Sequence, residues 1–151
     1  MATQRISPLD AHLGYWLRYV SNHVSHAFAQ KVATRGVSVA EWVMLRELYG
    51  APAVPSALAA KLGMSRGGIS KIVDRLEIKA LVTRTASTTD RRSQTLALTK
   101  AGLALVPKLA ALADRNDEEF FGHLDAAQRA GLATAMREIV RRSGLRSIPL
   151  E

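Results

Sequence analysis

The spacing of apolar residues divides this 151-residue chain into helical stretches and one hairpin. From Leu9 to about Ala33, apolar and aromatic side chains recur at helical spacing, and Gly36 suits the left-handed cap of this first helix. Ser38 and Glu41 form a capping-box pattern for a second helix, which should stop at Gly50. A long helix and a shorter one therefore open the predicted fold.

The next segment has the pattern of two helices joined by a tight turn. Pro55 suits the first turn of a short helix that runs through Lys61 and is closed by Gly63. Ser65 is a suitable N-cap for the following helix. The apolar positions of that helix share one face and are Ile69, Ile72, Val73 and Leu76. Its outer face is polar, so the pair is typical of a helix-turn-helix.

A hairpin and two more helices complete the pattern. Residues 81–86 and 94–98 have strand-like character, and the link 87–93 is rich in Ser, Thr and Asp. Residues 100–121 follow as one helix, and a capping box at Asp125 precedes a last helix. The predicted fold is mainly α with a small β wing, a winged helix-turn-helix. Its order is helix, helix, short strand, helix, helix, strand, strand, helix, helix.

The length fits one domain, residues 1–151. Within it we expect a DNA-binding lobe at 37–100 and dimerisation helices at 8–35 and 101–145. These terminal helices are too amphipathic to stand alone. Packing against each other and against a second copy would bury their apolar positions, which are Trp16, Val20, Leu103, Leu109, Leu112, Phe120, Leu132, Met136 and Ile139.

Positive charge is concentrated in the same lobe. Residues 61–100 hold nine Lys and Arg against three Asp and Glu, a net charge of +6, whereas the whole chain carries +8. A local positive field of this kind favours a polyphosphate backbone through counterion release. A membrane surface or an acidic protein could use the same field, so charge alone does not decide the partner.

Several classes of function are disfavoured by composition. The chain has no cysteine, which excludes disulfides, thiolate metal sites and thiol-oxidation switches. We find neither a signal peptide nor an apolar run near the roughly 18 residues of a membrane span, so we expect a soluble, cytoplasmic protein without membrane partners. No arguable catalytic triad or phosphate-binding Gly loop is present. The acidic run 117–119 is most simply a solvated helix face. We therefore expect neither enzymatic activity nor a cofactor.

The polar face of the helix after Ser65 has the side chains that a major groove requires. On this face, at suitable spacing, lie Arg66, Ser70, Lys71 and Arg75. Arg can pair with guanine, whereas Lys and Ser more often bind phosphate. Gly67 and its neighbour Gly68 each cost a helix roughly 1 kcal/mol relative to Ala, and close backbone approach to DNA would explain them. The alternative is that these charges only solvate an exposed face.

Residues 70–102, SKIVDRLEIKALVTRTASTTDRRSQTLALTKAG, resemble the recognition helix and wing of the MarR (multiple antibiotic resistance regulator) family. The matching features are the VDRLE helix end, the DRR wing tip and the LT-x-x-G entry into the next helix. At Ala80 this chain departs from the Gly that is common in the family, which makes a left-handed turn costlier there. The resemblance assigns DNA-binding roles to Ser65, Arg66, Ser70, Lys71 and Arg75 on the helix and to Asp90, Arg91 and Arg92 on the wing. Gly67 and Arg84 complete the predicted DNA-binding set.

The resemblance implies a homodimer of winged-helix subunits that binds a pseudo-palindromic operator in double-stranded DNA and usually represses transcription. One wing Arg could enter a narrow minor groove. The leading prediction is a ligand-responsive DNA-binding transcriptional regulator. The alternative is a winged-helix interaction module that uses the basic face for an acidic protein or RNA.

A stripe of aromatic and imidazole side chains follows the first helix. Members of this family often bind small phenolic or aromatic acids near the dimer helices, so His12, Trp16, Arg18 and Tyr19 are candidates for an effector pocket. The alternative is that the stripe is dimer interface or core. His23 and His26 could share a helical face, but no carboxylate joins them at ligand spacing, and we expect no metal site.

Overall fold

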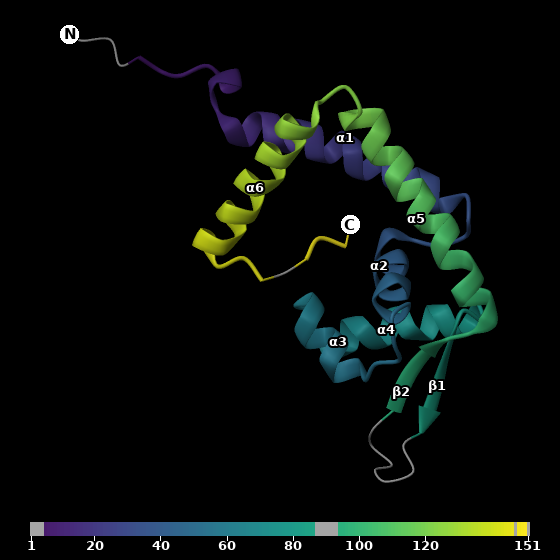
Figure 1. Ribbon diagram of the computed structural model, residues 1–151. Coiled ribbons are helices and arrows are strands. Elements are labelled where there is room, and N and C mark those ends of the chain that lie inside the picture. Colours follow the sequence, from purple (N-terminus) through teal and green to yellow (C-terminus); the bar gives the residue numbers. More distant parts are fainter. Residues whose placement is uncertain (1–4, 87–93, 147, 151) are drawn as a thin grey trace.

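The computed structural model describes residues 5–86, 94–146 and 148–150 (Figure 1). Its helices are α1 (Leu13–Ala33), α2 (Val39–Leu48), α3 (Pro55–Leu62), α4 (Arg66–Ile78), α5 (Lys100–Phe121) and α6 (Ala126–Ser143), preceded by the 3-10 helix η1 (Leu9–Ala11). Strands β1 (Val82–Ala86) and β2 (Gln94–Leu98) pair in an antiparallel hairpin. The predicted winged helix-turn-helix fold is confirmed.

Local capping explains why the helices begin where they do. In α2 the Ser38 hydroxyl accepts from the Glu41 amide at 3.1 Å, and the Glu41 carboxylate accepts from the Ser38 amide at 3.2 Å. Asp125 and Gln128 form the equivalent capping box at α6. Both predicted boxes are therefore present, and each satisfies amides that the first helical turn leaves without partners.

The predicted short strand before the third helix is a single β-bridge. Ala53 pairs with Leu96 of β2 through two backbone hydrogen bonds, of 3.0 and 2.8 Å. Within the hairpin, the register runs from Val82 opposite Leu98 to Ala86 opposite Gln94. The bridge ties the chain between α2 and α3 to the wing.

The core lies in the lobe formed by α2, α3, α4 and the hairpin. Its fully buried side chains include Met44 and Leu45 of α2, Leu62 of α3, Ile69 of α4 and Leu96 of β2. The C-terminal part of α1 and the N-terminal half of α5 add Val32, Val106 and Leu109 to the same cluster. Helix α4 therefore rests its apolar face on this core and turns its other face outward.

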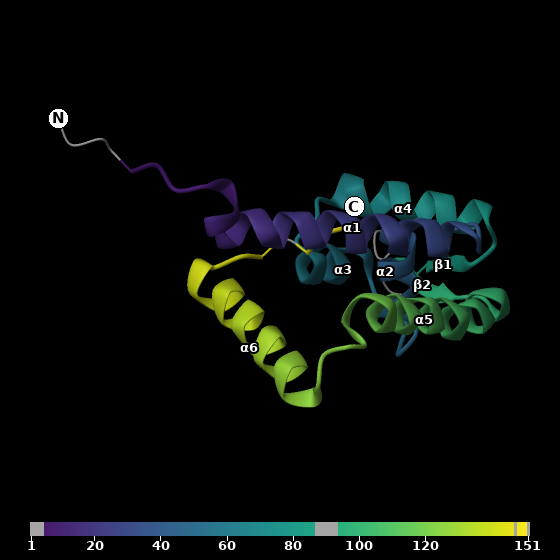
Figure 2. The same cartoon turned by 90° about the horizontal axis from the view of Figure 1, so that it is seen from above.

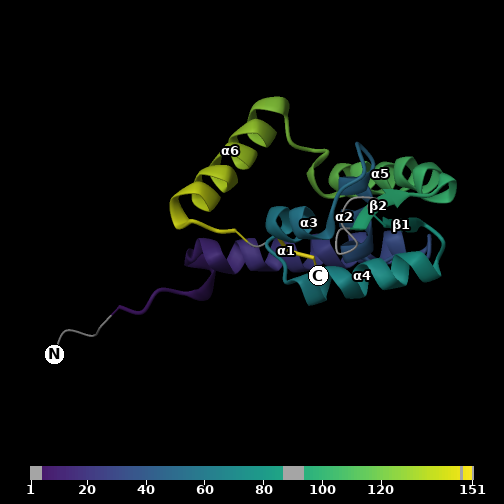
Figure 3. The same ribbon diagram turned by 90° about the horizontal axis from the view of Figure 1, so that it is seen from below.

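The ends of the chain are less covered than the lobe. Helix α6 stands apart from α4 in all three views, and none of its residues is buried (Figures 1, 2 and 3). Among the apolar positions predicted to be buried by the terminal helices, Leu109 is buried, whereas Trp16 is 50% exposed and Ile139 is 56% exposed. A single chain thus leaves much of this apolar surface in contact with water.

The first helix begins later than the expected Leu9. Residues 9–11 form η1, and His12 is extended, with φ −96° and ψ 128°, before α1 starts at Leu13. The His12 amide donates to the Leu9 carbonyl oxygen at 3.2 Å, and the His12 Nδ1 lies 3.1 Å from the Pro8 carbonyl oxygen. These short-range contacts close a separate turn, which the helical spacing of the apolar residues conceals.

Candidate nucleic-acid interface

Helix α4 presents the predicted polar face to solvent. Arg66, Gly67, Ser70, Lys71 and Arg75 are all exposed. The opposite face is buried through Ile69, Ile72, Val73 and Leu76. Because the two faces are separated so fully, the exposed one is available for a ligand along the length of the helix.

A left-handed glycine and a capping serine form the turn between α3 and α4. Gly63 caps α3 in the left-handed region at φ 65°, where glycine carries no Cβ penalty. Ser65 then caps α4, its hydroxyl accepting from the Gly68 amide at 3.0 Å. Ser65 is therefore the N-cap of α4, as predicted, and its side chain is part of the turn.

The two adjacent glycines of α4 have different surroundings. A Cβ on Gly67 would meet no atom within 4 Å, whereas one on Gly68 would lie 3.2 Å from the Met64 Cε and 3.3 Å from the Ser65 Oγ. Packing against the turn thus explains why Gly68 is small. Nothing in the described structure restricts Gly67, so close approach to an external ligand stays a prediction for it.

Ion pairs divide the cations of residues 61–100 into two groups. Lys61 pairs with Glu47, Lys79 with Glu41, and Arg84 with both Asp74 and Glu77. Within the described ranges no ion pair involves the cations on the outer surface, which are Arg66, Lys71, Arg75 and Lys100. Among the described residues, the positive charge of the outer face of α4 is therefore not neutralised by an ion pair.

Arg84, a predicted DNA contact, faces helix α4. Its Nε donates to Glu77 and its Nη2 to Asp74, so β1 is joined to α4 by one guanidinium and two carboxylates. The Arg84 side chain is 25% exposed. Sequence reasoning counted its charge but had no signal for this pairing.

The junction between α4 and β1 uses a left-handed alanine. Ala80 has φ 57° and is the one non-glycine residue in the described ranges with positive φ. The Leu81 amide donates to the Leu76 carbonyl oxygen and the Ala80 amide to that of Glu77, each at 2.9 Å. These are the two bonds of a Schellman motif, so the helix end keeps the usual geometry despite the missing glycine.

The predicted wing tip cannot be described in the same way. Asp90, Arg91 and Arg92 lie outside the described residues. The described strands β1 and β2 extend from the end of α4 (Figure 1). Their predicted role at the minor groove therefore stays a prediction.

The four candidate effector residues do not form one pocket in the single chain. Arg18 and Tyr19 line a hollow of about 470 Å³ together with Gly14, Tyr15 and Asn22. His12 lies before the helix. Trp16 is held by its Nε1, which donates to the Asp10 carbonyl oxygen at 2.7 Å. Sequence reasoning missed Tyr15, whose ring lies edge-on to Trp16 with centroids 5.2 Å apart.

A second hollow, of about 510 Å³, lies where α1 meets α2. Its lining is apolar apart from Ser38 and includes Ala29, Ala33, Val37 and Leu150 near the C-terminus. No sequence pattern indicated this hollow, because its lining joins residues on both sides of the turn at Gly36 to Leu150, which is distant in sequence. No charged side chain among the described residues lines this hollow.

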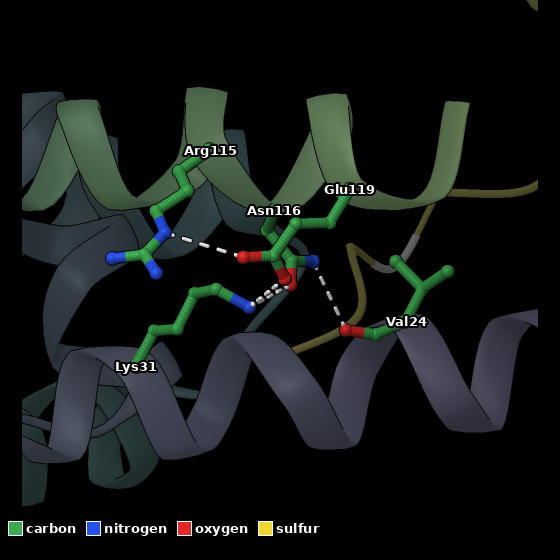
Figure 4. A network of polar contacts seen from close by, with 5 residues as sticks. All are labelled: Val24, Lys31, Arg115, Asn116 and Glu119. Atoms are coloured by element: carbon green, nitrogen blue, oxygen red, sulfur yellow. Dashed lines mark hydrogen bonds and ion pairs between the residues drawn. The ribbon is translucent and has the colours of Figure 1, made fainter. Parts of the chain in front are cut away.

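A polar network joins α1 to α5 (Figure 4). The buried Asn116 donates to the Val24 carbonyl oxygen at 3.1 Å and accepts from the Lys31 Nζ at 2.9 Å. Lys31 also donates to Glu119 at 2.7 Å, and this hydrogen bond, with a smaller one from Arg115, lowers the pKa of Glu119. Residues 117–119 are all exposed, as the sequence interpretation predicts, and Glu119 in addition pairs with Lys31.

The described part of the chain offers neither a metal site nor a membrane-spanning helix. It contains no group of three His, Cys, Asp or Glu side chains that could hold a metal ion. None of its helices combines the length and apolar character needed to cross a bilayer.

Comparison with known proteins identifies the family. The MarR family model matches residues 35–93, which include α2, the helix-turn-helix and β1. A putative transcriptional regulatory protein for the hcr operon of Thauera aromatica is 31% identical over 135 residues, covering 88% of this chain and 81% of that protein.

Solved structures show the same fold. The MepR–DNA complex of S. aureus superposes with a TM-score of 0.79 at 19% identity, covering 87% of this chain and 98% of MepR. CouR from Rhodococcus jostii, bound to p-coumaroyl-CoA, has a TM-score of 0.76 at 23% identity and covers 95% of this chain and 99% of its own. The chain therefore belongs to the MarR family of transcriptional regulators.

Proposed function

We propose that this regulator binds a pseudo-palindromic operator in double-stranded DNA as a homodimer and represses transcription. The observation that carries the proposal is the exposed face of α4, where Arg66, Lys71 and Arg75 stand outside the ion pairs of the described structure. In the proposed complex α4 lies in the major groove and the wing follows the adjacent minor groove. The role is binding without catalysis, and its target places it in the cytoplasm.

The homodimer is supported by the apolar surface that one chain leaves exposed. Trp16 and Leu17 of α1 and Ile139 of α6 are each at least half exposed, as is Leu145 after α6. Large apolar side chains that are this exposed are typical of a protein interface. Pairing two copies through these helices would set two α4 helices on successive major grooves, about one helical turn apart.

The interface is tested by removing one cation at a time. Arg75→Ala and Arg92→Ala should each weaken binding to a duplex from the protein's own promoter region by about tenfold. Arg46→Ala on α2 is the matched control, because it removes the same charge from an exposed position outside α4, the wing and the helices proposed to form the dimer. Unchanged binding by both interface variants would show that the assignment is wrong.

A small aromatic effector is the second part of the proposal. Arg18 could pair with a carboxylate while Tyr15 and Tyr19 border the same hollow. CouR, which shares the fold, is a protein with a phenolic ligand. An effector would release DNA by preferring a dimer whose α4 spacing no longer fits the operator.

The effector site is tested by fluorescence in a Trp42→Phe variant, which leaves Trp16 as the reporter. Aromatic acids should change Trp16 emission and release the operator, and Arg18→Gln should reduce both effects. A panel of such acids that changes neither signal would favour the alternative that the stripe serves packing.

The interaction-module alternative predicts a different preference. A module for RNA or acidic proteins would bind an RNA hairpin or a polyanion as tightly as the promoter duplex. The proposed regulator should prefer the duplex by at least about a thousandfold at physiological salt.

A further inference from the structure

We propose that Lys79 and Glu41 form a latch that positions the recognition helix for operator binding, although neither residue contacts DNA. The inference rests on the proposed DNA-binding function. Lys79 is the C-cap of α4, and Glu41 lies in the first turn of α2. The latch therefore joins the end of the DNA-reading helix to the corner where α1 passes into α2.

All three hydrogen-bond donors of the Lys79 ammonium group have acceptors within the protein. Its Nζ donates to Glu41 Oε1 at 2.9 Å, to Glu41 Oε2 at 2.7 Å and to the Gly36 carbonyl oxygen at 2.8 Å. An ammonium group has three donors, so none is left for a phosphate. This cation of the basic lobe serves position rather than DNA contact.

Glu41 depends on its ion pair with Lys79, because its carboxylate is buried. It is only 3% exposed, and its Oε1 also accepts from the Ser38 amide at 3.2 Å. Leaving a buried carboxylate without its cation is strongly unfavourable. The Glu41 carboxylate therefore fixes the position of Lys79 and, with it, the C-terminal end of α4. Because Glu41 belongs to the capping box of α2, that place is fixed to the α1–α2 corner.

The latch lies at the C-terminal end of α4, where a small change alters the orientation of the whole helix. Residues 79–81 form the turn that ends α4 and begins β1, and the carbonyl oxygens of Ala80 and Leu81 accept from Thr99 at the start of α5. Helix α4 has 13 residues and is therefore roughly 20 Å long. A small rotation at its fixed end would displace Arg66, near the other end, from the groove.

The test uses Glu41→Gln and Lys79→Gln in the full-length protein, with operator affinity measured over a range of salt concentrations while circular dichroism shows both variants folded. Each should weaken operator binding about tenfold, and the double variant should be no weaker than either alone. The slope of log affinity against log salt should not change. Glu41→Gln is the sharper test, because removing an anion beside a basic lobe would otherwise strengthen binding.

Two results would overturn the latch. One is operator binding by Glu41→Gln as tight as wild type, or tighter. The other is a salt slope that falls by about one unit in Lys79→Gln, which would make Lys79 a phosphate contact. Should either single variant unfold, the double variant decides the matter, because it leaves no buried carboxylate without its cation, and operator binding as tight as wild type would then overturn the latch. Failure of the DNA-binding function itself would show differently, as wild type without operator affinity.

Discussion

A Cβ atom on Gly102 would lie 2.3 Å from the carbonyl oxygen of Leu81. Helix α5 thus begins in direct backbone contact with the first residues after α4, and the Thr99 amide donates to the same oxygen at 3.0 Å. The LT-x-x-G pattern that resembles the family is, in physical terms, a capping threonine followed by the glycine that permits this contact.

We predict that Gly102→Ala lowers the free energy of unfolding by about 1 to 3 kcal/mol, because the methyl group meets backbone that cannot move aside. Urea unfolding measures the change. Gly67→Ala is the matched control, since its added methyl group meets open space, and it should raise stability by up to about 1 kcal/mol. A neutral Gly102→Ala would mean that the contact between α5 and Leu81 is looser than 2.3 Å implies.

Ala80→Gly should stabilise the protein by about 1 kcal/mol, because Ala80 occupies the left-handed region at φ 57°, where a Cβ is unfavourable. Thermal or urea unfolding measures this. Ala111→Gly, an exposed position inside α5, should show the opposite sign by about the same amount. Destabilisation by Ala80→Gly would contradict the left-handed turn.

Arg84→Gln should lower the free energy of unfolding by less than about 1 kcal/mol, since its carboxylate partners on α4 are partly exposed. Its effect on operator binding should leave the salt slope unchanged, because the guanidinium joins β1 to α4. If the slope falls by about one unit, Arg84 contacts phosphate, as the sequence analysis predicted.

Stability should depend on pH through Glu119. The hydrogen bond from Lys31 lowers the pKa of Glu119 below its ordinary value of 4.5, so this stabilising contribution is complete above pH 4.5 and is lost as pH falls through the lowered pKa. Glu119→Gln should be slightly less stable than wild type at neutral pH and should converge with it in acid.

Urea midpoints of both proteins measured from about pH 7 to about pH 3 test this dependence. Asp117→Asn is the control, as Asp117 forms no ion pair among the residues described. A difference between wild type and Glu119→Gln that stays constant with pH would exclude the ionised Glu119 as its source.

The elements were predictable where their signals are local. Ser38 with Glu41, Ser65 before α4 and Thr99 before α5 each act within one helical turn, so adjacent residues suffice to place them. The start of α1 was misplaced, because Leu9 keeps helical spacing to Leu13 while the backbone of His12 between them is extended.

The candidate interface was predictable only in part. The exposure of Arg66, Lys71 and Arg75 follows from the helical period. The partners of Lys79 and Arg84 do not, because Glu41 lies 38 residues before Lys79, and Arg84 meets Asp74 only through the turn that joins α4 to β1. The net charge of residues 61–100 therefore includes cations that form ion pairs within the protein.

The account is tested most directly by fluorescence anisotropy with two duplexes of equal length, one from the protein's own promoter region and one of scrambled sequence, over a range of salt concentrations. We predict that the promoter duplex binds tighter by at least about a thousandfold and that both affinities fall steeply as salt increases. Equal affinity for the two duplexes at every salt concentration would contradict sequence-specific recognition by α4.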